Sequence, residues 1–232
     1  MSKIKGLIFD KDGTLFDFAA TWEAWAEAFL IRLCAGDQAQ AARAGAAIGY
    51  DLAGARFDRD SVVIAGTPDD VVAALAPYFP GRAPAELRGV INEEAARAPQ
   101  AEAVPLKPLL TALRARGLKL GVATNDAEAP AQAHLGAAGV VEFFDFIAGF
   151  DSGHGAKPAP GQLRAFAALT GLALEACAMI GDSTHDLRAG RAAGMTCVAV
   201  LTGLAEADAL APLADVVLPD IGHLPAWLDG GA

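Results

Sequence analysis

The amino-acid sequence predicts an α/β protein, a doubly wound parallel sheet with a helical insertion after the first strand. Two observations carry this prediction. Short apolar runs alternate with segments of helical spacing along most of the chain, which is typical of a parallel sheet covered by helices on both faces. The long stretch after the first apolar run breaks this alternation and shows helical periodicity instead.

Six apolar runs predict the strands of the sheet. The first is Ile4–Phe9, which ends directly before Asp10. The others follow the insertion and are Leu118–Ala123, Phe144–Ala148, Cys177–Ile180, Thr196–Leu201 and, more weakly, Val216–Leu218. Runs of this kind fit strands that are buried on both faces.

Four segments between these runs have the apolar spacing of helices. They are Leu106–Arg116, Pro130–Ala138, Pro160–Leu169 and Thr184–Ala193. Glycines follow them at positions where helices commonly end in a left-handed residue; these are Gly117, Gly139, Gly171 and Gly194. The helix and strand patterns therefore agree on a doubly wound, Rossmann-like core.

The stretch between the first two strands predicts a separate helical domain. Its first helix is indicated by apolar residues at helical spacing, namely Trp22, Trp25, Phe29 and Leu33. Further helices are predicted over Thr67–Tyr78, with Thr67 as the N-cap, and over Ala85–Ala98. We therefore expect a core domain of residues 1–17 plus 101–232 and a helical cap domain of residues 18–100.

The composition excludes several classes of protein. Lys and Arg number 18 against 28 Asp and Glu, a net charge of −10, whereas nucleic-acid binding needs a basic face. At 53% hydrophobic residues the chain is too apolar to be disordered. The N-terminus lacks the features of a signal peptide, and the longest uncharged stretch, Ala192–Ala205, is shorter than the roughly 20 residues of a membrane span. We expect a cytoplasmic protein with no membrane or nucleic-acid partner.

The strongest local pattern comprises two carboxylates directly after the first strand, in the run DKDGT. Asp10 and Asp12 stand at the carboxyl end of that strand, facing the crevice where α/β proteins bind ligands. Gly13 allows a sharp turn and a close approach to a ligand. A tight turn with an Asp cap explains the same letters, and the motif taken alone favours that interpretation.

A second pair of carboxylates follows the fourth apolar run. Asp182 comes directly after that strand, and Asp186 lies in the first turn of the next helix. An N-capped helix start explains one of these residues but leaves the other without a role. If the first and fourth strands are neighbours, Asp10 and Asp12 converge with this pair, and their repulsion favours a hard, oxygen-bound cation such as Mg²⁺.

Two further strand ends carry groups suited to a phosphate. Thr124 and Asn125 follow the second run and offer a hydroxyl and backbone N–H groups. Lys157 follows the third run and can neutralise phosphoryl oxygens. Each is weak alone, since a lone loop lysine is usually solvated. Together, four successive predicted strands each end in a group that suits phosphate chemistry.

In order and placement, these four motifs resemble those of the haloacid dehalogenase superfamily, specifically its phosphatase branch. The resemblance covers the whole chain, and the insertion resembles the helical cap of that family. In cap placement and chain length the sequence is most similar to phosphoglycolate phosphatases. The resemblance implies a metal-dependent hydrolase that acts on a small phosphate ester.

The resemblance also implies a role for each catalytic residue. Asp10 would be the nucleophile that forms an aspartyl-phosphate. Asp12 would be the general acid that protonates the leaving alcohol and then the base that activates water. Thr124 and Lys157 would bind the transferring phosphoryl group and stabilise its charge.

The same resemblance implies a Mg²⁺ site and a phosphate site. The metal ligands would be Asp10, the backbone carbonyl of Asp12, Asp182 and Asp186, the last of these orienting the waters of the metal or Lys157. The phosphate group would also be bound by Gly13, Thr14 and Asn125.

One departure from the family pattern is Lys11, where an apolar residue usually stands between the two carboxylates. We expect its side chain to point away from the crevice and to have a small effect on the site, although it could pair with an acidic neighbour. Among the histidines, we expect His134 to pack in the protein or to lie in solvent.

The cap should decide the substrate. The segment Gly49–Asp60 is polar, bears glycine and is predicted to be irregular, as a substrate loop would be. We therefore expect Arg43, Arg56 or Arg59 to lie near the mouth of the site and to bind a carboxylate or hydroxyl groups of the substrate.

The sequence thus predicts a Mg²⁺-dependent phosphatase whose partner is a small phosphorylated metabolite, similar to phosphoglycolate. A phosphosugar mutase of the same superfamily, which retains the aspartyl-phosphate for transfer, is an alternative. A non-catalytic sensor of a phosphorylated ligand is another, which Asp12 disfavours because binding alone does not require it. We expect a monomer or a homodimer.

Overall fold

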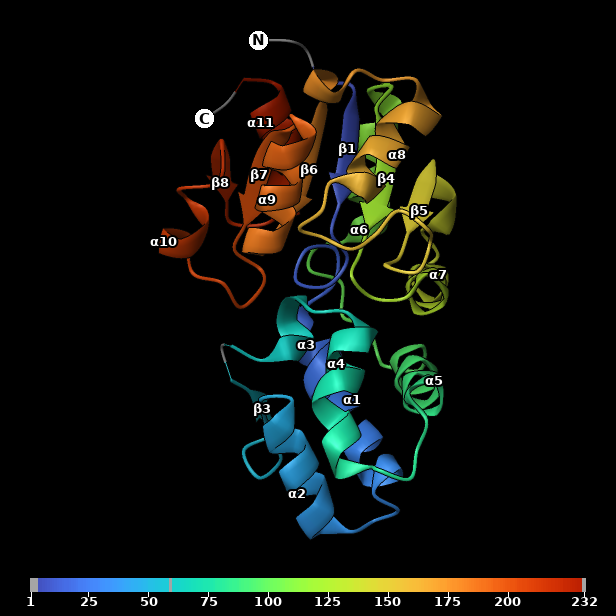
Figure 1. The fold of residues 1–232 in the computed structure, drawn as a ribbon. Coiled ribbons are helices and arrows are strands. Elements are labelled where there is room, and N and C mark those ends of the chain that lie inside the picture. Colours follow the sequence, from blue (N-terminus) through green and yellow to red (C-terminus); the bar gives the residue numbers. More distant parts are fainter. Residues whose placement is uncertain (1–3, 59, 231–232) are drawn as a thin grey trace.

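The computed structural model describes residues 4–58 and 60–230 and has the predicted fold class (Figure 1). Within these residues, six parallel strands form one sheet in the order β5-β4-β1-β6-β7-β8. Their bounds are β1 Gly6–Phe9, β4 Lys119–Ala123, β5 Phe146–Ala148, β6 Cys177–Gly181, β7 Thr196–Val200 and β8 Val216–Leu218. β1 pairs with β4 on one side and β6 on the other, so the order runs outward from it in both directions. A doubly wound sheet of this kind opens a crevice at the carboxyl ends of its strands.

Helices cover both faces of the sheet. On one face, Phe9 of β1 packs with residues of α6 (Leu106–Ala115). On the other, Ile8 packs with residues of α8 (Gly161–Thr170) and α9 (Thr184–Ala193). Neighbouring residues of a strand face opposite sides, so β1 must be apolar throughout, as the sequence shows.

Among the remaining core helices, α7 (Glu128–Ala137) corresponds to the predicted segment Pro130–Ala138. The others are α10 (Ala207–Leu210) and α11 (Leu224–Leu228), with the 3₁₀ turns Val141–Phe143, Leu174–Ala176 and Ile221–His223. α7 begins two residues before the predicted Pro130, because a proline in the first turn removes no intrahelical hydrogen bond. The glycines predicted to end helices all have positive φ; they are Gly117, Gly139, Gly171 and Gly194.

The insertion after β1 is helical and has an apolar core of its own. Its helices are α1 (Phe18–Leu33), α2 (Gln38–Ala47), α3 (Val62–Ala65), α4 (Pro68–Leu75) and α5 (Pro84–Ala95). The apolar spacing predicted for α1 is confirmed, since Trp22, Trp25, Phe29 and Leu33 are all buried. The rings of Trp25 and Phe29 stack with their centroids 4.9 Å apart. We call this insertion the cap.

The prediction that Gly49–Asp60 is an irregular loop is wrong for the described part of that segment. Tyr50–Asp51 (β2) and Arg56–Phe57 (β3) form a short antiparallel hairpin. The ring of Phe57 packs against that of Tyr50, with 4.8 Å between centroids. Strands of two residues are too short to show an alternating pattern, so the sequence does not reveal them. Arg59 lies outside the described residues.

The helix predicted over Thr67–Tyr78 is shorter as an α-helix. α4 ends at Leu75 and continues as a 3₁₀ turn over Ala76–Tyr78. Pro77 has no N–H for the next helical hydrogen bond and restricts the backbone of the residue before it. The predicted N-cap is confirmed, because Thr67 and Asp70 form a capping box.

The cap lies beyond the carboxyl ends of the strands, and the arrowheads of the strands point toward it (Figure 1). The chain leaves and returns to the core at one place, where the N–H of Asp17 donates to the carbonyl of Ala101 at 2.8 Å. The exact domain boundaries at residues 17/18 and 100/101 stay a prediction. Among the helices of the described ranges, none is long and apolar enough to cross a bilayer.

Candidate active site

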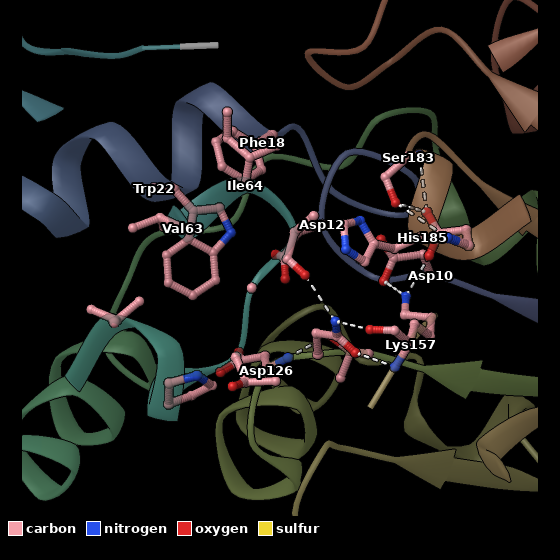
Figure 2. A pocket seen from close by; sticks show the side chains of 18 of the residues that line it. Asp10, Asp12, Phe18, Trp22, Val63, Ile64, Asp126, Lys157, Ser183 and His185 are labelled. Atoms are coloured by element: carbon pink, nitrogen blue, oxygen red, sulfur yellow. Dashed lines mark hydrogen bonds and ion pairs between the residues drawn. The ribbon is translucent and has the colours of Figure 1, made fainter. Parts of the chain in front are cut away.

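A pocket lies between the strand ends and the cap (Figure 2). Its empty volume, counted out to its open mouth, is about 590 Å³. The core contributes polar residues: Asp10, Asp12, Thr124, Asn125, Asp126, Lys157, Ser183, His185 and Asp186. The structure therefore brings residues of all four sequence motifs to one pocket.

Three carboxylates form a buried acidic cluster beside this pocket. One oxygen of each of Asp10, Asp182 and Asp186 lies within 4.8 Å of the others. Asp10 follows β1 and Asp182 follows β6, so the pairing of these strands places them side by side. Asp186 stands in the first turn of α9, where its carboxylate accepts hydrogen bonds from the N–H and the hydroxyl of Ser183. The predicted convergence is confirmed for these three residues.

Lys157 is in contact with two of the three carboxylates. Its Nζ lies 2.7 Å from Asp10 Oδ1 and 2.6 Å from Asp186 Oδ1. Burial would lower the pKa of Lys157, but these two carboxylates outweigh burial and hold that pKa above its usual value. The ammonium group therefore stays charged.

One lysine does not compensate the whole cluster. Burial, together with the charge of Asp186, raises the pKa of Asp10 to about 7 despite the opposing effect of Lys157. Burial and the charges of Asp10 and Asp186 also raise the pKa of Asp182 well above its usual value. Protons or a further cation must offset the repulsion between these carboxylates.

The residues present fit a divalent metal ion. Asp10, Asp182 and Asp186 offer oxygen ligands only, which hard cations prefer. The backbone at Gly203 lies close to the Asp182 carboxylate, since a Cβ there would stand 1.7 Å from Asp182 Oδ2. The donor set fits Mg²⁺, whose identity stays a prediction, as does the contribution of the Asp12 carbonyl.

Gly13 and Thr14 hold Asp182 in place. Gly13 has φ +77°, and a Cβ there would lie 2.4 Å from Asp182 Oδ2, so the position needs glycine on both counts. The Thr14 hydroxyl donates to Asp182 Oδ1 at 3.0 Å. The hydroxyl of Thr202 donates to the carbonyl of Gly13 at 2.6 Å. Gly13 and Thr14 do not line the pocket, so their predicted phosphate contact stays a prediction.

Thr124 and Asn125 occupy the end of β4 as predicted. Thr124 is 2% exposed, lines the pocket, and accepts a hydrogen bond from the N–H of Asp126 at its hydroxyl. The Asn125 amide accepts from the N–H of Lys157 at 2.8 Å and donates to its carbonyl at 2.9 Å. Asn125 also donates to the carbonyl of Ala65 in the cap. Its side chain therefore fixes the Lys157 loop and joins core to cap.

Lys11 does not line the pocket but pairs with a residue that does, and the expectation that it has a small effect on the site stays a prediction. Its side chain is fully buried, and its Nζ lies 2.7 Å from Asp12 Oδ2 and 3.4 Å from Asp126 Oδ2. The predicted pairing with an acidic neighbour is thus confirmed. Burial would lower the pKa of Lys11, but the two carboxylates keep it above its usual value. Lys11 therefore holds Asp12 by a buried ion pair at the pocket.

His134 continues this contact to the cap. Its Nδ1 lies 2.9 Å from Lys11 Nζ and its Nε2 lies 2.7 Å from the carbonyl of Ala95 in α5. Because an ammonium group only donates, Nδ1 must accept, and Nε2 must carry the proton that it donates. Burial and the charge of Lys11 lower the pKa of His134 to about 4. His134 packs in the protein, as expected, and is neutral.

Two of the three arginines predicted to bind substrate lie away from the pocket. Arg43 in α2 and Arg56 in β3 are exposed, and neither lines it. Arg59 lies outside the described residues. Sequence reasoning missed Asp126 and His134. A third polar residue after β4 was a signal for Asp126, whereas no local pattern marks His134, whose role depends on a partner far along the chain.

Comparisons with known proteins identify a matching family and related sequences. A family model described as haloacid dehalogenase-like hydrolase matches residues 4–194. A phosphoglycolate phosphatase of Rhodospirillum rubrum is 36% identical over 120 residues, which are 52% of this chain and 50% of that protein. The chain thus spans about half the length of the curated relatives it matches.

Solved structures show the same fold along nearly the whole chain. A putative phosphoglycolate phosphatase from Lactobacillus delbrueckii has a TM-score of 0.71 at 22% identity and covers 97% of this chain and 98% of its own. CbbY from Rhodobacter sphaeroides, solved in complex with phosphate, has a TM-score of 0.68 at 23% identity, with 97% and 99% covered. At these identities the likeness concerns the fold alone.

The acidic cluster predicts that Mg²⁺ stabilises the protein. A ligand at about 100 times its Kd adds about 2.7 kcal/mol, so we expect Tm to rise by about 5–10 °C for a chain of this size. Asp182→Asn should remove most of this rise. Asp215→Asn changes a surface carboxylate that pairs with Arg191 and should keep it. Equal responses of the two variants in differential scanning calorimetry would contradict the site.

The buried ion pair of Lys11 predicts a large loss of stability in Lys11→Met. The change leaves Asp12 and Asp126 without their cation, and breaking a buried pair from one side costs about 3–5 kcal/mol. Adding Asp126→Asn removes one uncompensated carboxylate and should restore part of the loss. Urea unfolding at pH 7 measures both variants. A double variant no more stable than Lys11→Met would mean that Asp126 is not the partner that matters.

The neutral state of His134 predicts acid sensitivity. Its pKa is about 4 in the folded protein and about 6.5 when unfolded. The unfolded chain therefore binds the proton first, and stability falls as pH falls from 6.5 to 4, by about 3 kcal/mol. His134→Gln keeps an acceptor and a donor without titrating. In urea unfolding across that pH range, the free energy of unfolding of the wild type should fall by this amount relative to that of the variant. If the two free energies change with pH in parallel, His134 is not a neutral group with a lowered pKa.

Proposed function

The chain belongs to the haloacid dehalogenase-like hydrolase family, and from this premise we propose that it is a Mg²⁺-dependent phosphatase. Its substrate would be a small phosphomonoester, hydrolysed through an aspartyl-phosphate. The observation that carries the proposal is the position of Asp10. Its carboxylate lies 2.7 Å from Lys157 Nζ and belongs to the acidic cluster, in the same pocket as Asp12.

Asp10 is the nucleophile in this proposal. A bond forms between its carboxylate oxygen and phosphorus while the bond from phosphorus to the leaving oxygen breaks. Lys157 orients the carboxylate and faces the negative charge of the phosphoryl group, to which the hydroxyl of Thr124 can donate. A divalent ion held by Asp10, Asp182 and Asp186 would supply positive charge that offsets the repulsion between carboxylate and phosphate.

Asp12 moves the protons. It gives a proton to the leaving oxygen, so that a neutral alcohol departs. Water then attacks the aspartyl-phosphate, Asp12 takes up the proton of that water, and inorganic phosphate leaves with Asp10 restored. Lys11 Nζ, 2.7 Å from Asp12 Oδ2, holds this carboxyl group in a defined position at the pocket. The arrangement thus offers a nucleophile and a separate acid and base.

The proposal predicts phosphate release that depends on the metal and on both carboxylates. With Mg²⁺, the wild type should release inorganic phosphate from acetyl phosphate and from a panel of esters that includes 2-phosphoglycolate, and EDTA should stop it. Asp10→Asn should lower kcat by at least about 10⁴-fold because the nucleophile is lost. Asp12→Asn should lower kcat on the esters by about 10²–10⁴-fold.

The same assay separates the alternatives. A mutase would convert one sugar phosphate into an isomer with little phosphate release. A sensor would bind phosphate esters with equal affinity in wild type and Asp12→Asn and would turn none over. Absence of phosphate release from every compound, acetyl phosphate included, would refute the phosphatase.

A further inference from the structure

The cap side of the pocket is apolar. Its lining consists of apolar side chains, among them Phe18, Trp22, Trp25, Val63 and Ile64, together with Thr67. Thr67 and the two indole N–H groups provide the polar side-chain atoms of this set. The core side is rich in carboxylates and holds Lys157. The two halves of the pocket therefore suit different parts of one substrate. The phosphoryl group suits the core side and the leaving group suits the cap side.

Among the described residues that line the pocket, Lys157 is the one with a permanent positive charge. It already contacts Asp10 and Asp186. On the cap side, no lysine or arginine of the described chain faces the pocket. A carboxylate on the leaving group would thus be buried against apolar side chains without a partner, which is strongly unfavourable.

The N-terminus of α4 does not compensate for the missing cation. Pro68, its first residue, has no N–H. The N–H of Thr67 and its hydroxyl already donate to the Asp70 carboxylate. With Asp69, this places two acidic residues in the first turn, and they oppose the binding of another anion.

Two buried donors on this wall have no acceptor. Trp22 is 8% exposed and Trp25 is 2% exposed, and among the described residues neither indole Nε1 finds a hydrogen-bond partner. Figure 2 shows the nitrogen edge of Trp22 turned toward Asp12. The Trp22 and Trp25 rings contact edge to face, with centroids 5.1 Å apart. Buried indole N–H groups normally donate to a partner, so an acceptor on the ligand suits this wall.

We propose, on the basis of the phosphatase function above, that the substrate is the phosphate ester of an uncharged, largely apolar aryl or alkyl alcohol. Its phosphoryl group lies by Asp10 and Lys157, and its alcohol part packs on Trp22, Val63 and Ile64. A neutral oxygen acceptor on the alcohol receives an indole N–H. The cap thereby disfavours esters such as 2-phosphoglycolate that carry a carboxylate.

A matched series of substrates tests this class. Benzyl phosphate, its 4-carboxylate and the methyl ester of that carboxylate share one leaving position, and the last two have similar size and differ in charge. We expect kcat/KM for the methyl ester to exceed that for the carboxylate by at least about 100-fold. 2-Phosphoglycolate should be a poorer substrate than benzyl phosphate. An equal or inverted order would overturn the substrate class.

Binding keeps the test independent of turnover. The corresponding three benzylphosphonates, which cannot be hydrolysed, are titrated calorimetrically into the wild type with Mg²⁺. The neutral pair should bind at least about 100-fold more tightly than the carboxylate. If that order holds and no ester is hydrolysed, the phosphatase function fails and the ligand class stands. If the carboxylate binds as well as its ester, the ligand class fails whatever the activity.

Charge introduced into the wall should change the preference. Ile64→Lys places a cation on the cap side and should reduce the ratio between methyl ester and carboxylate by at least about tenfold. Leu169→Lys is a matched control, because Leu169 in α8 is 64% exposed and does not line the pocket, and it should keep the wild-type ratio. Trp22→Phe keeps a ring without the N–H and should reduce the advantage of the methyl ester over benzyl phosphate. If Ile64→Lys leaves the ratio of methyl ester to carboxylate unchanged, the cap side of the pocket does not determine the preference for uncharged substrates.

Discussion

Repulsion between three buried carboxylates is the constraint on which the site depends. Parallel strands end at the same edge of the sheet, so the pairing of β1 with β6 brings Asp10 beside Asp182, and α9 adds Asp186. Lys157 offsets part of this charge through contacts with two of the three. Burial and the remaining repulsion raise the pKa values of Asp10 and Asp182. A site of this kind favours cations, and a bound cation reconciles the net charge of −10 with the anionic substrate that we propose.

A second buried charge ties the core to the cap. Lys11 joins Asp12 to His134, and His134 donates to the carbonyl of Ala95 in the cap. Asn125, which follows β4, also connects core and cap, because its side-chain amide donates to the carbonyl of Ala65. Two core residues, of which Asn125 lines the pocket, thus bond to cap backbone. The position of the cap and the position of Asp12 therefore depend on a common set of contacts.

The pocket divides its chemistry between its two sides. The core supplies charge at the strand ends. There the absence of a side chain at Gly13 leaves room for the Asp182 carboxylate. The cap supplies an apolar wall built on an aromatic cluster, with indole N–H groups as its donors. The two sides differ because the helices of the cap pack their apolar faces against one another. The surface that the cap turns toward the core continues this apolar packing. In this chain the surface that it offers is an extension of its aromatic core.

Sequence alone determined the sheet, the helices that flank it, the insertion after β1 and the four motifs, because each is encoded locally by apolar periodicity, glycine positions and strand-end residues. It also placed Asp10, Asp182 and Asp186 together once β1 and β6 were assumed to be neighbours. Tertiary structure decided the rest. Lys11 proved to be a buried partner of Asp12, Gly13 and Thr14 proved to hold Asp182, and Arg43 and Arg56 proved to lie away from the pocket. Local patterns indicate which residues can be buried or charged. The partner of a buried charge depends on how the chain packs, which brings Lys11 and His134 together although they lie 123 residues apart in the sequence.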